Sequence, residues 1–516
     1  MGNHLLSFDI GTSGVKAGLF TSDGVLVGTA YQEYGVTYPK AQWVEQSISE
    51  MWQAQCLISN KLMDKANLPS AEIAAIGISC QRATFVPVDE NEKPLMNFIG
   101  WQDKRSIRQC EHMRRIVGEE LYYQIAGLPI DPTAAVSKIL WIKDNHPEIF
   151  ERTAKFYSTQ NVHLHQLGVE NSPCDLPDAA YLGLLDVDRL VWSEELCEQL
   201  EIPLEKLPDL APSGVQVGEL SASAAKSLGL NKGIPIVTVG GDLQCAGVGM
   251  GITQAGLTSV GIGTGGGILI YLDEPLRHPT GAMNCLPHAV ENTWEMEGIC
   301  LSSGAVYKWL RDTIGISEKE QALAAGVDPY DLLNELAGSE EPGAQGIIVI
   351  PSFIGAGCPN WNPLARGAFL GLSLSTERKT LIRAVMEGIC LEIRWMLEEA
   401  NALGTPIQEV RIWGGAAKSE LWNQIAADVY GTPVSKTANS EAGLIGAAIL
   451  AGTGVDLFDS VQEGVDCLVQ VAERYEPKPD LRSMYDEKFS IYKAAYTALS
   501  DQGIFERIAE QSNQNE

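Results

Sequence analysis

Residues 7–14 read SFDIGTSG and residues 259–266 read SVGIGTGG, so one glycine-rich pattern recurs about half a chain later. Each copy lies between two apolar runs. An apolar run, a Gly-Thr turn and a second apolar run are typical of a β-hairpin. Two related hairpins at this spacing predict two similar domains, each of which begins with a glycine-rich turn.

The composition is that of a globular protein with an acidic surface. The 516 residues are 45% hydrophobic and 20% charged, which is enough to build two large domains. The 37 Lys and Arg residues against 66 Asp and Glu residues give a net charge of −29. This balance argues against nucleic-acid binding and against docking on anionic membranes. It permits an anionic small ligand, because backbone N–H groups and Mg²⁺ can hold phosphate on an acidic protein.

The cysteines and the N-terminal segment indicate a cytoplasmic protein. The 11 cysteines include no CxxC pair, and scattered thiols fit a reducing compartment. The start, MGNHLLSFDIG, lacks the cationic and apolar regions of a signal peptide. No apolar run approaches the ~18 residues that a membrane span needs.

Strand and helix patterns alternate along the chain, which predicts α/β layers. The expected strands are 25–30, 74–79 and 234–242, and the expected helices are 47–67, 132–146 and 441–452. Residues 410–431 read as strand, tight turn and helix, and the final EQSNQNE reads as a polar tail.

The first glycine-rich turn has the chemistry of a phosphate site. Gly11 and Gly14 permit exposed N–H groups, and the Thr12 and Ser13 hydroxyls lie between them. Asp9 ends the preceding strand and could hold Mg²⁺. A tight hairpin without a ligand is an equal alternative for this copy taken alone.

The second turn keeps Gly263, Thr264, Gly265 and Gly266 but has Gly261 where the first has Asp9. It would be a second phosphate site without a metal ligand. GIGTGG also satisfies the dinucleotide pattern GxGxxG, but the strand-like GILIYL follows where that fingerprint needs a helix. The pattern therefore does not favour a dinucleotide site.

Two further stretches could carry chemistry. Asp242 ends an apolar strand, where α/β proteins bind ligands, and could accept a hydroxyl proton; the alternative is a helix N-cap. Gly414-Gly415-Ala416 follows the strand VRIW and would let a flat ring or a phosphate approach the backbone, or would serve close packing alone.

Polar groups beside an aromatic ring suit a polyhydroxylated ligand. Gln81 and Arg82 follow a buried strand, and Trp101-Gln102-Asp103 follows a second apolar segment. All are otherwise ordinary loop residues. His163 and His165 lack further ligand-type neighbours, so a packing role is favoured over a metal.

Together these stretches resemble the FGGY carbohydrate kinases, within the sugar kinase/actin/chaperone-ATPase superfamily. The similarity runs from about residue 5 to about residue 480 and rests on several motifs in order: FDIGTSGVK, VGGDLQCAGVG, GIGTGGG and WGGAAKSELWNQIAADV. KILWIKDN (138–145) and GAFLGLSLSTERKTLIRAVMEG (367–388) resemble the two family signatures, with Ala135 and Thr380 as departures.

The resemblance implies two similar ribonuclease-H-like (actin-like ATPase) domains with a central cleft. We expect an N-terminal domain over 1–252, an ATP-binding C-terminal domain over 253–484, and a C-terminal helix and polar tail over 485–516. The implied reaction is transfer of the γ-phosphoryl group of ATP to a hydroxyl group of a sugar or polyol. Dimers are common among relatives, so the resemblance also allows a homodimer.

The resemblance also implies roles for individual residues. Asp242 would be the general base and Asp9 the Mg²⁺ ligand. The residues expected to hold the sugar are Gln81, Arg82, Trp101, Asp103, Asp242 and Gln244. The residues expected to bind ATP are Gly11, Thr12, Ser13, Gly14, Lys16, Gly263, Thr264, Gly265, Gly414, Gly415, Ala416 and Ser419.

Within the family, WVEQ (43–46), DLPDAAYLGLLDVDRLVWS (175–193) and NPLARGAFLGL (362–372) are most similar to xylulokinases, so D-xylulose or a related pentulose is the first candidate substrate. Xylulokinases typically carry Met-His where this chain has Arg82-Ala83. Glycerol kinases carry Arg-Glu there, and autoinducer-2 kinases also show an arginine. Ribulose, glycerol, erythritol or an autoinducer-2-type substrate therefore stay open, as do a nucleotide switch of the same superfamily and a sugar-binding regulator.

Overall fold

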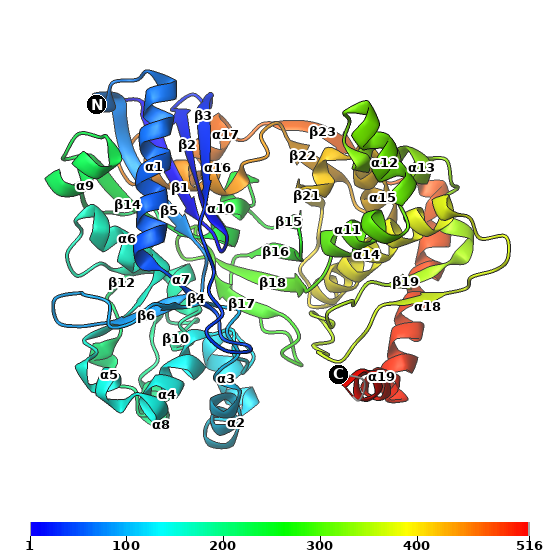
Figure 1. Cartoon of the computed structure of the whole chain (residues 1–516), viewed down its shortest axis with the longest axis horizontal. Coiled ribbons are helices and arrows are strands. Elements are labelled where there is room, and N and C mark those ends of the chain that lie inside the picture. Colours follow the sequence, from blue (N-terminus) through cyan, green and yellow to red (C-terminus); the bar gives the residue numbers. More distant parts are fainter. Residues whose placement is uncertain (1, 514–516) are drawn as a thin grey trace.

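The structure is a computed structural model that describes residues 2–513. Two main β-sheets lie side by side, with helices around them (Figure 1). The first sheet is built from the N-terminal half of the chain and the second from the C-terminal half. Both halves begin with the hairpin that the sequence predicts.

The first sheet has the order β13-β14-β5-β1-β2-β3. β1, β2 and β3 form an antiparallel meander, and β5 and β14 run parallel to β1. Its strands, in spatial order, are β13 (Gln216–Glu219), β14 (Pro235–Gly241), β5 (Ile73–Cys80), β1 (His4–Ile10), β2 (Gly14–Thr21) and β3 (Leu26–Glu33).

The second sheet repeats this plan. β15, β16 and β18 form the antiparallel meander, and β21 and β22 run parallel to β15. Its strands, in spatial order, are β17 (Asn284–Pro287), β18 (Trp294–Cys300), β16 (Gly266–Leu272), β15 (Leu257–Ile262), β21 (Glu409–Gly414), β22 (Val434–Thr437) and β23 (Val471–Tyr475). The duplication predicted from two eight-residue stretches is therefore present in whole sheets.

Local chemistry explains the first long helix, α1 (Ile48–Ala66). The Ser47 hydroxyl accepts a hydrogen bond from the Glu50 backbone N–H at its N-terminus, and Asn67 ends it in the left-handed conformation. Its apolar side packs on the first sheet with Met51, Ile58 and Leu62 buried. The sequence predicted this helix to within a residue at each end.

A large insertion separates β5 from β14 and has its own hydrophobic core. Three of its strands, β7 (Phe98–Ile99), β6 (Phe85–Val88) and β8 (Lys155–Ser158), form a sheet in the order β4-β7-β6-β8 with β4 (Glu45–Gln46), which precedes β5 in the chain. Two short pairs join β10 (Leu185–Asp186) to β11 (Val191–Trp192) and β9 (Cys174–Asp175) to β12 (Leu210–Ala211). Its helices are α2 (Ile107–Ile116), α3 (Glu119–Ala126), α4 (Ala135–Asn145), α5 (Pro147–Arg152), α6 (Thr159–Leu167), α7 (Leu176–Ala180), α8 (Glu194–Gln199) and α9 (Ala222–Leu228).

The predicted helix over 132–146 is shorter than expected. It begins at Ala135, and Pro147 opens a second helix after the break at His146. Proline at the first helical position is favoured because its missing N–H would have no partner there. Pro147 therefore marks a helix start as well as a helix end.

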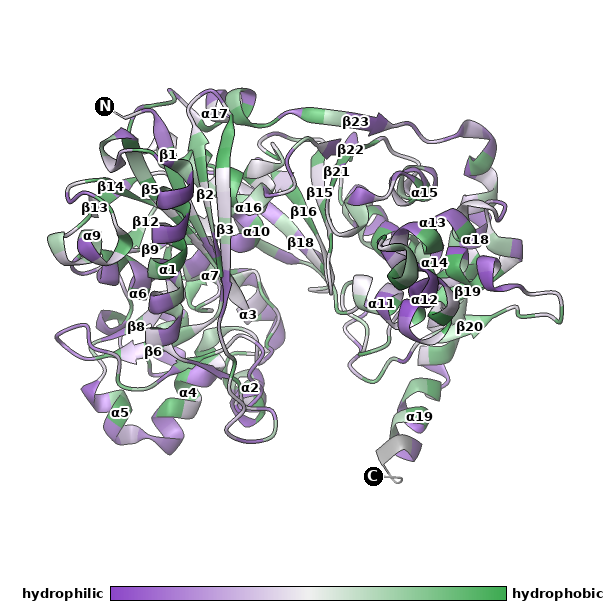
Figure 2. Ribbon diagram, turned by 45° about the horizontal axis from the view of Figure 1, so that its top comes forward, coloured by the Kyte–Doolittle hydropathy of each residue, from purple (hydrophilic) through white to green (hydrophobic). Residues whose placement is uncertain are grey.

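Two helices lie together between the main sheets, α10 (Asp242–Gly249) and α16 (Ala442–Thr453) (Figures 1 and 2). They approach so closely that a Cβ on Gly446 would lie 1.8 Å from the Cys245 carbonyl oxygen. The small residues of α16 permit this close approach, and α10 is the helix that makes it. Although α16 comes late in the chain, it packs into the core of the first sheet beside Leu5 and Val237.

Most of the rest of the C-terminal half covers the second sheet, whereas α17 (Val461–Leu468) packs on α16 in the core of the first sheet. The other helices of this half are α11 (Gly304–Thr313), α12 (Ile316–Ala325), α13 (Pro329–Gly338), α14 (Arg378–Ala402), α15 (Glu420–Tyr430), α18 (Arg482–Asp501) and α19 (Ile504–Asn513), and β19 (Ile348–Ile350) pairs with β20 (Ala368–Leu370). α19 reaches into the segment expected as a polar tail, whose last three residues lie outside the described part. Within residues 2–513, no helix combines the length and apolarity that crossing a membrane requires.

Candidate functional site

The turn between β1 and β2 is held by backbone and side-chain hydrogen bonds. The Gly11 N–H donates to the Gly14 carbonyl over 3.0 Å. A Cβ on Gly14 would lie 2.6 Å from the Tyr31 hydroxyl, so only glycine fits there. Thr12 is held from two sides: Gln46 donates to its carbonyl over 2.7 Å, and the Trp101 indole donates to its hydroxyl over 2.9 Å.

Asp9 lies at the end of β1, directly opposite Lys16 on β2. Its Oδ1 is buried and has no hydrogen-bond partner among the described residues. Burial and the nearby Asp242 carboxylate raise the pKa of Asp9 to about 7, against the opposing charge of Lys16. Lys16 in turn pairs with Glu441, at 3.0 Å, at the start of α16. A buried carboxylate oxygen without a partner fits a cation ligand.

Asp242 opens α10 directly after β14. Gly241 is the N-cap, so Asp242 is not the capping residue, and its side chain accepts from the neighbouring Leu243 N–H over 2.8 Å. The Asp242 side chain is 48% exposed, but protein atoms surround it, so it is partly shielded from bulk water. This enclosure raises its pKa above the ordinary value, while Arg82 opposes the shift. The result is an accessible carboxylate with increased basicity.

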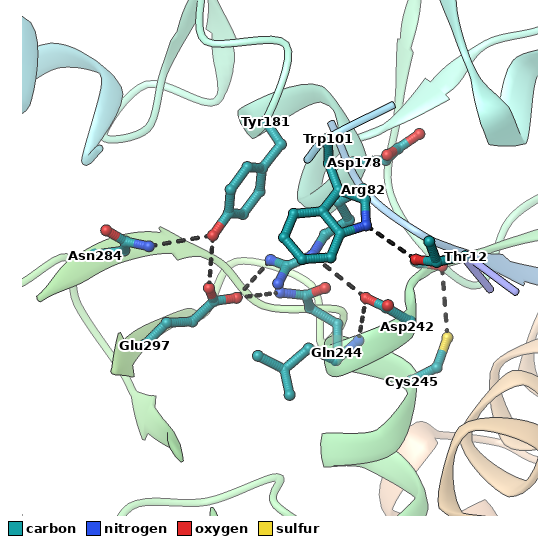
Figure 3. Close-up of polar contacts among 12 residues, drawn as sticks. Thr12, Arg82, Trp101, Asp178, Tyr181, Asp242, Gln244, Cys245, Asn284 and Glu297 are labelled. Atoms are coloured by element: carbon teal, nitrogen blue, oxygen red, sulfur yellow. Dashed lines mark hydrogen bonds and ion pairs between the residues drawn. The ribbon is translucent and has the colours of Figure 1, made fainter. Parts of the chain in front are cut away.

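Arg82 follows β5 and reaches toward Asp242 with its Nε 3.6 Å from Asp242 Oδ1 (Figure 3). Its Nη1 donates to Glu297 Oε1 over 2.5 Å, and its guanidinium stacks on the Tyr181 ring at 4.3 Å. Gly241 makes room for it, since a Cβ there would lie 2.4 Å from Arg82 Cδ. Ala83 has φ +61°, a left-handed conformation that turns the chain away after Arg82.

Several polar residues around Arg82 were not anticipated from the sequence. The Tyr181 hydroxyl donates to Glu297 Oε2 over 2.9 Å and accepts from Asn284 over 3.1 Å. Gln244 donates to Glu297 over 3.0 Å and also to Glu295. Asp178 lies near Arg82, and burial together with Asp175 raises its pKa to about 8. Glu295 and Glu297 are two acidic residues inside the otherwise apolar strand WEMEGIC, and this unusual pattern was the only sequence signal for them. Their partners lie far away in the sequence.

The residues expected to hold the sugar divide into two groups. Arg82, Trp101 and Asp242 have accessible side-chain surface, with Trp101 37% exposed. Gln81 and Gln244 are buried behind them. Gln81 donates to Gln46 over 2.7 Å and thereby supports the first turn.

Asp103 does not join this group. Its side chain is fully buried. Its Oδ2 accepts from the Val44 N–H over 2.5 Å and from Arg105 Nη2 over 2.8 Å, and its Oδ1 accepts from Arg105 Nε over 2.9 Å. With both carboxylate oxygens engaged, Asp103 fixes the loop that carries Trp101. The sequence placed Asp103 two residues after Trp101 and gave no sign that Arg105 would bind the Asp103 carboxylate.

The second turn lies beside the Gly414–Gly415 segment. Ile262 pairs with Gly266 across the hairpin and with Gly414 on β21. Gly414 has φ +89°, and a Cβ there would lie 2.6 Å from the Ile262 carbonyl oxygen. The structure therefore brings the residues expected for phosphate and for adenosine next to each other. Ala416 begins the short 3₁₀ turn Ala416–Lys418, and Ser419 caps α15 by accepting from the Trp422 N–H over 3.2 Å.

Within residues 2–513, no cluster of three or more His, Cys, Asp or Glu side chains is arranged to hold a metal. His163 is buried against Gln55, at 2.8 Å, and burial lowers its pKa to about 3, as a packing role predicts. A metal bound mainly by a nucleotide needs only one or two protein carboxylates, so Asp9 still fits Mg²⁺ carried by a phosphate ligand.

Residues 4–249 match the N-terminal domain and residues 259–455 the C-terminal domain of the FGGY family of carbohydrate kinases. A gluconokinase from Bacillus licheniformis is 29% identical over 506 residues, covering 97% of this chain and 97% of the relative. A xylulose kinase from Bacillus subtilis is 29% identical over 499 residues, covering 96% and 97%. A ligand-bound xylulose kinase structure from Lactobacillus acidophilus superposes with a TM-score of 0.88 at 24% identity, covering 96% of this chain and 98% of that one. The expected fold of two actin-like ATPase domains is confirmed.

Proposed function

The chain belongs to the FGGY family of carbohydrate kinases, which are phosphotransferases acting on sugar hydroxyl groups, and from that premise we propose that it transfers the γ-phosphoryl group of ATP to a neutral ketose or polyol. D-Xylulose or a related pentulose is the first candidate. The observation that supports this most directly is the accessible Asp242 carboxylate between Arg82 and the glycine-rich turn that carries Asp9.

Asp242 acts as the general base. A proton acceptor is most effective when its pKa lies near the working pH, and the surroundings of Asp242 move its pKa in that direction. Its carboxylate takes the proton of the substrate hydroxyl as that oxygen attacks phosphorus. Because phosphoryl transfer depends mainly on positioning and charge stabilisation, few other groups need to react.

The two turns bind the phosphates through backbone N–H groups and the hydroxyls of Thr12, Ser13 and Thr264. Lys16 adds a positive charge on the first turn. Asp9 would hold Mg²⁺, which when bound neutralises charge on the phosphates. Gly414, Gly415, Ala416 and Ser419 line the adenosine side.

The charges around Arg82 favour a neutral substrate over a sugar acid. A bound carboxylate would need an uncompensated cation, but Glu297 already neutralises Arg82 at 2.5 Å. Asp242 adds a further negative charge beside it. Trp101 offers an apolar ring face for the C–H side of a sugar, and the Arg82 guanidinium keeps further N–H donors for hydroxyl oxygens.

The test is a coupled ADP-release assay with Mg·ATP against D-xylulose, D- and L-ribulose, L-fuculose, L-rhamnulose, glycerol, erythritol, gluconate and an autoinducer-2 precursor. We expect ADP release that depends on a neutral ketose or polyol. Release with gluconate alone would refute the neutral-substrate proposal. Release that ignores every compound would favour a nucleotide switch. The domain limits 1–252, 253–484 and 485–516, the cytoplasmic location and a homodimer stay predictions.

A further inference from the structure

A buried ion pair joins the two halves of the chain beside Asp242. Arg82 follows β5 of the first sheet, and Glu297 lies in β18 of the second sheet, 215 positions later. The Glu297 side chain is fully buried, and that of Arg82 is 10% exposed. Glu297 therefore lies behind the accessible surface that Asp242 and Trp101 present, and only a small part of Arg82 reaches that surface.

Glu297 is fixed by three donors. The Arg82 guanidinium and Gln244 both donate to Oε1, at 2.5 and 3.0 Å, and the Tyr181 hydroxyl donates to Oε2 at 2.9 Å (Figure 3). The Tyr181 ring also lies against the guanidinium. Arg82 is thus held between an aromatic face and a carboxylate, and it has one orientation.

This orientation matters because Arg82 has two carboxylates within reach. It makes a close hydrogen bond to Glu297 but stays 3.6 Å from Asp242, beyond hydrogen-bond distance. A guanidinium that closed fully on Asp242 would occupy the oxygen that must accept the proton and would stabilise its charged form. Attraction to Glu297 prevents that movement.

We propose that Glu297 is a positioning residue for phosphoryl transfer, which holds the Arg82 guanidinium away from Asp242 and cancels its charge. The proposal rests on the proposed function, because it gives Asp242 the proton-accepting role. Glu297 does not touch the substrate, and it acts through Arg82. The second half of the chain thereby contributes to the proton-transfer chemistry of the first half.

Glu295 supplies a matched control. It is buried two residues before Glu297 on the same strand and accepts from the same Gln244 amide. Burial and the neighbouring Glu297 charge raise the pKa of Glu295 well above its ordinary value, whereas Arg82 and its hydrogen bonds lower that of Glu297 despite burial. The surroundings therefore favour the neutral form of Glu295, which glutamine resembles in shape, and the charged form of Glu297, which glutamine replaces with a neutral group.

The experiment compares Glu297→Gln and Glu295→Gln in the full chain, with the neutral substrate that gives the highest turnover. We expect Glu297→Gln to lower kcat by about 10²-fold, the usual result of misplacing a catalytic constellation. We expect Glu295→Gln to stay within about threefold of the wild type because the swap conserves volume. Equal kcat values for the two variants would overturn the proposal.

The pH profile gives a second readout. The charged and titratable groups near Asp242 are Arg82, Glu297, Asp9, Asp178 and the thiols of Cys80 and Cys245. Loss of the Glu297 charge and closer approach of Arg82 both lower the pKa of Asp242. The acidic limb of kcat/KM therefore moves to lower pH in Glu297→Gln, which a purely structural role would not produce.

The double variant Arg82→Gln/Glu297→Gln separates a positioning role from a folding defect. Removing both charges leaves no unpaired buried ion, so this variant folds even if Glu297→Gln does not. If Glu297 acts through Arg82, the kcat of the double variant equals that of Arg82→Gln within about threefold. If the fold-loss in kcat of the double variant equals the product of the losses of the two single variants, the proposal is overturned.

Failure of the proposed function is distinguishable from failure of this inference. Wild type that phosphorylates no compound refutes the function alone. The same variants are then compared by ADP release without sugar, where equal rates for wild type and Glu297→Gln would overturn the positioning role.

Discussion

The two glycine-rich turns share a backbone plan and differ in chemistry. In the first, Asp9 lies opposite Lys16, and in the second, Gly261 lies opposite Gly267. Next to Asp9 on the parallel strand is Ser79, whereas next to Gly261 is Trp413. The space of the missing side chain is filled, since a Cβ on Gly261 would lie 2.6 Å from Trp413 Cζ2.

This difference shows that duplication copied a shape that can bind phosphate, while the ionisable groups stayed in one copy. Strand pairing depends on backbone and apolar pattern, which both halves keep. A carboxylate needs a cation or a proton to offset burial, and only the first turn has Lys16 and a place for a metal. If the ionisable groups act only in the first half, substitutions there should change catalysis, and substitutions in the second turn should change stability.

The largest effect is expected at Asp242, at the end of β14 in the first half. Asp242→Ala should keep the fold and lower kcat by about 10²–10⁴-fold, the usual span for a positioned base. The coupled assay measures kcat, and calorimetry measures ATP affinity. Near-wild-type turnover with normal ATP affinity would show that Asp242 is not the general base.

Asp9→Asn comes next. We expect activity to fall by about 10–10²-fold, because the carboxylate would hold Mg²⁺ and the isosteric amide holds it poorly. The Mg²⁺ concentration for half-maximal rate should rise, while sugar affinity measured without nucleotide stays unchanged. Equal losses in both measurements would contradict a metal role.

Gly261→Ala tests the second turn. The added methyl group overlaps the Trp413 ring, so we expect the free energy of unfolding to fall by about 1–3 kcal/mol. Gly263→Ala is the matched control, because its Cβ would lie 3.7 Å from the nearest atom. Chemical denaturation compares the two. Equal stability would show that Trp413 yields and that the second turn could accommodate a side chain.

The smallest effect concerns pH and stability, measured with chelator present. The pKa of Asp9 is raised from 3.8 to about 7, so between these values the folded state binds more protons than the unfolded state. Stability therefore falls as pH rises through this window. Asp9→Asn lacks that loss, and its advantage over wild type should grow by about 1 kcal/mol, about a degree in Tm, from pH 6 to pH 7. An advantage independent of pH would contradict the raised pKa.

Much of the fold was predictable because its signals are local. The α1 helix follows from its cap and its apolar period, and the two hairpins follow from a Gly-Thr turn between apolar runs. The end of the helix predicted over 132–146 was right to within a residue, but the second helix that begins at Pro147 was missed, because proline can end one helix or begin the next.

The candidate site was predictable only in part. Asp9, Asp242, Arg82 and Trp101 were predicted from their places at strand ends and from motif similarity, and their roles stay predictions. Asp103 was misplaced because Arg105 engages both of its oxygens. Glu297 and Tyr181 were missed because they meet each other, and Arg82 meets Glu297, across more than a hundred positions.

The sequence by itself determined the duplicated α/β plan, the family and the reaction class, since these depend on local periodicity and on motifs whose residues are close together in the chain. Only the tertiary structure decided that α16 completes the first sheet and that Glu297 neutralises Arg82 beside Asp242. The physical reason is that packing and Coulomb energies depend on distance in space, and long-range contacts leave no periodic trace in the sequence.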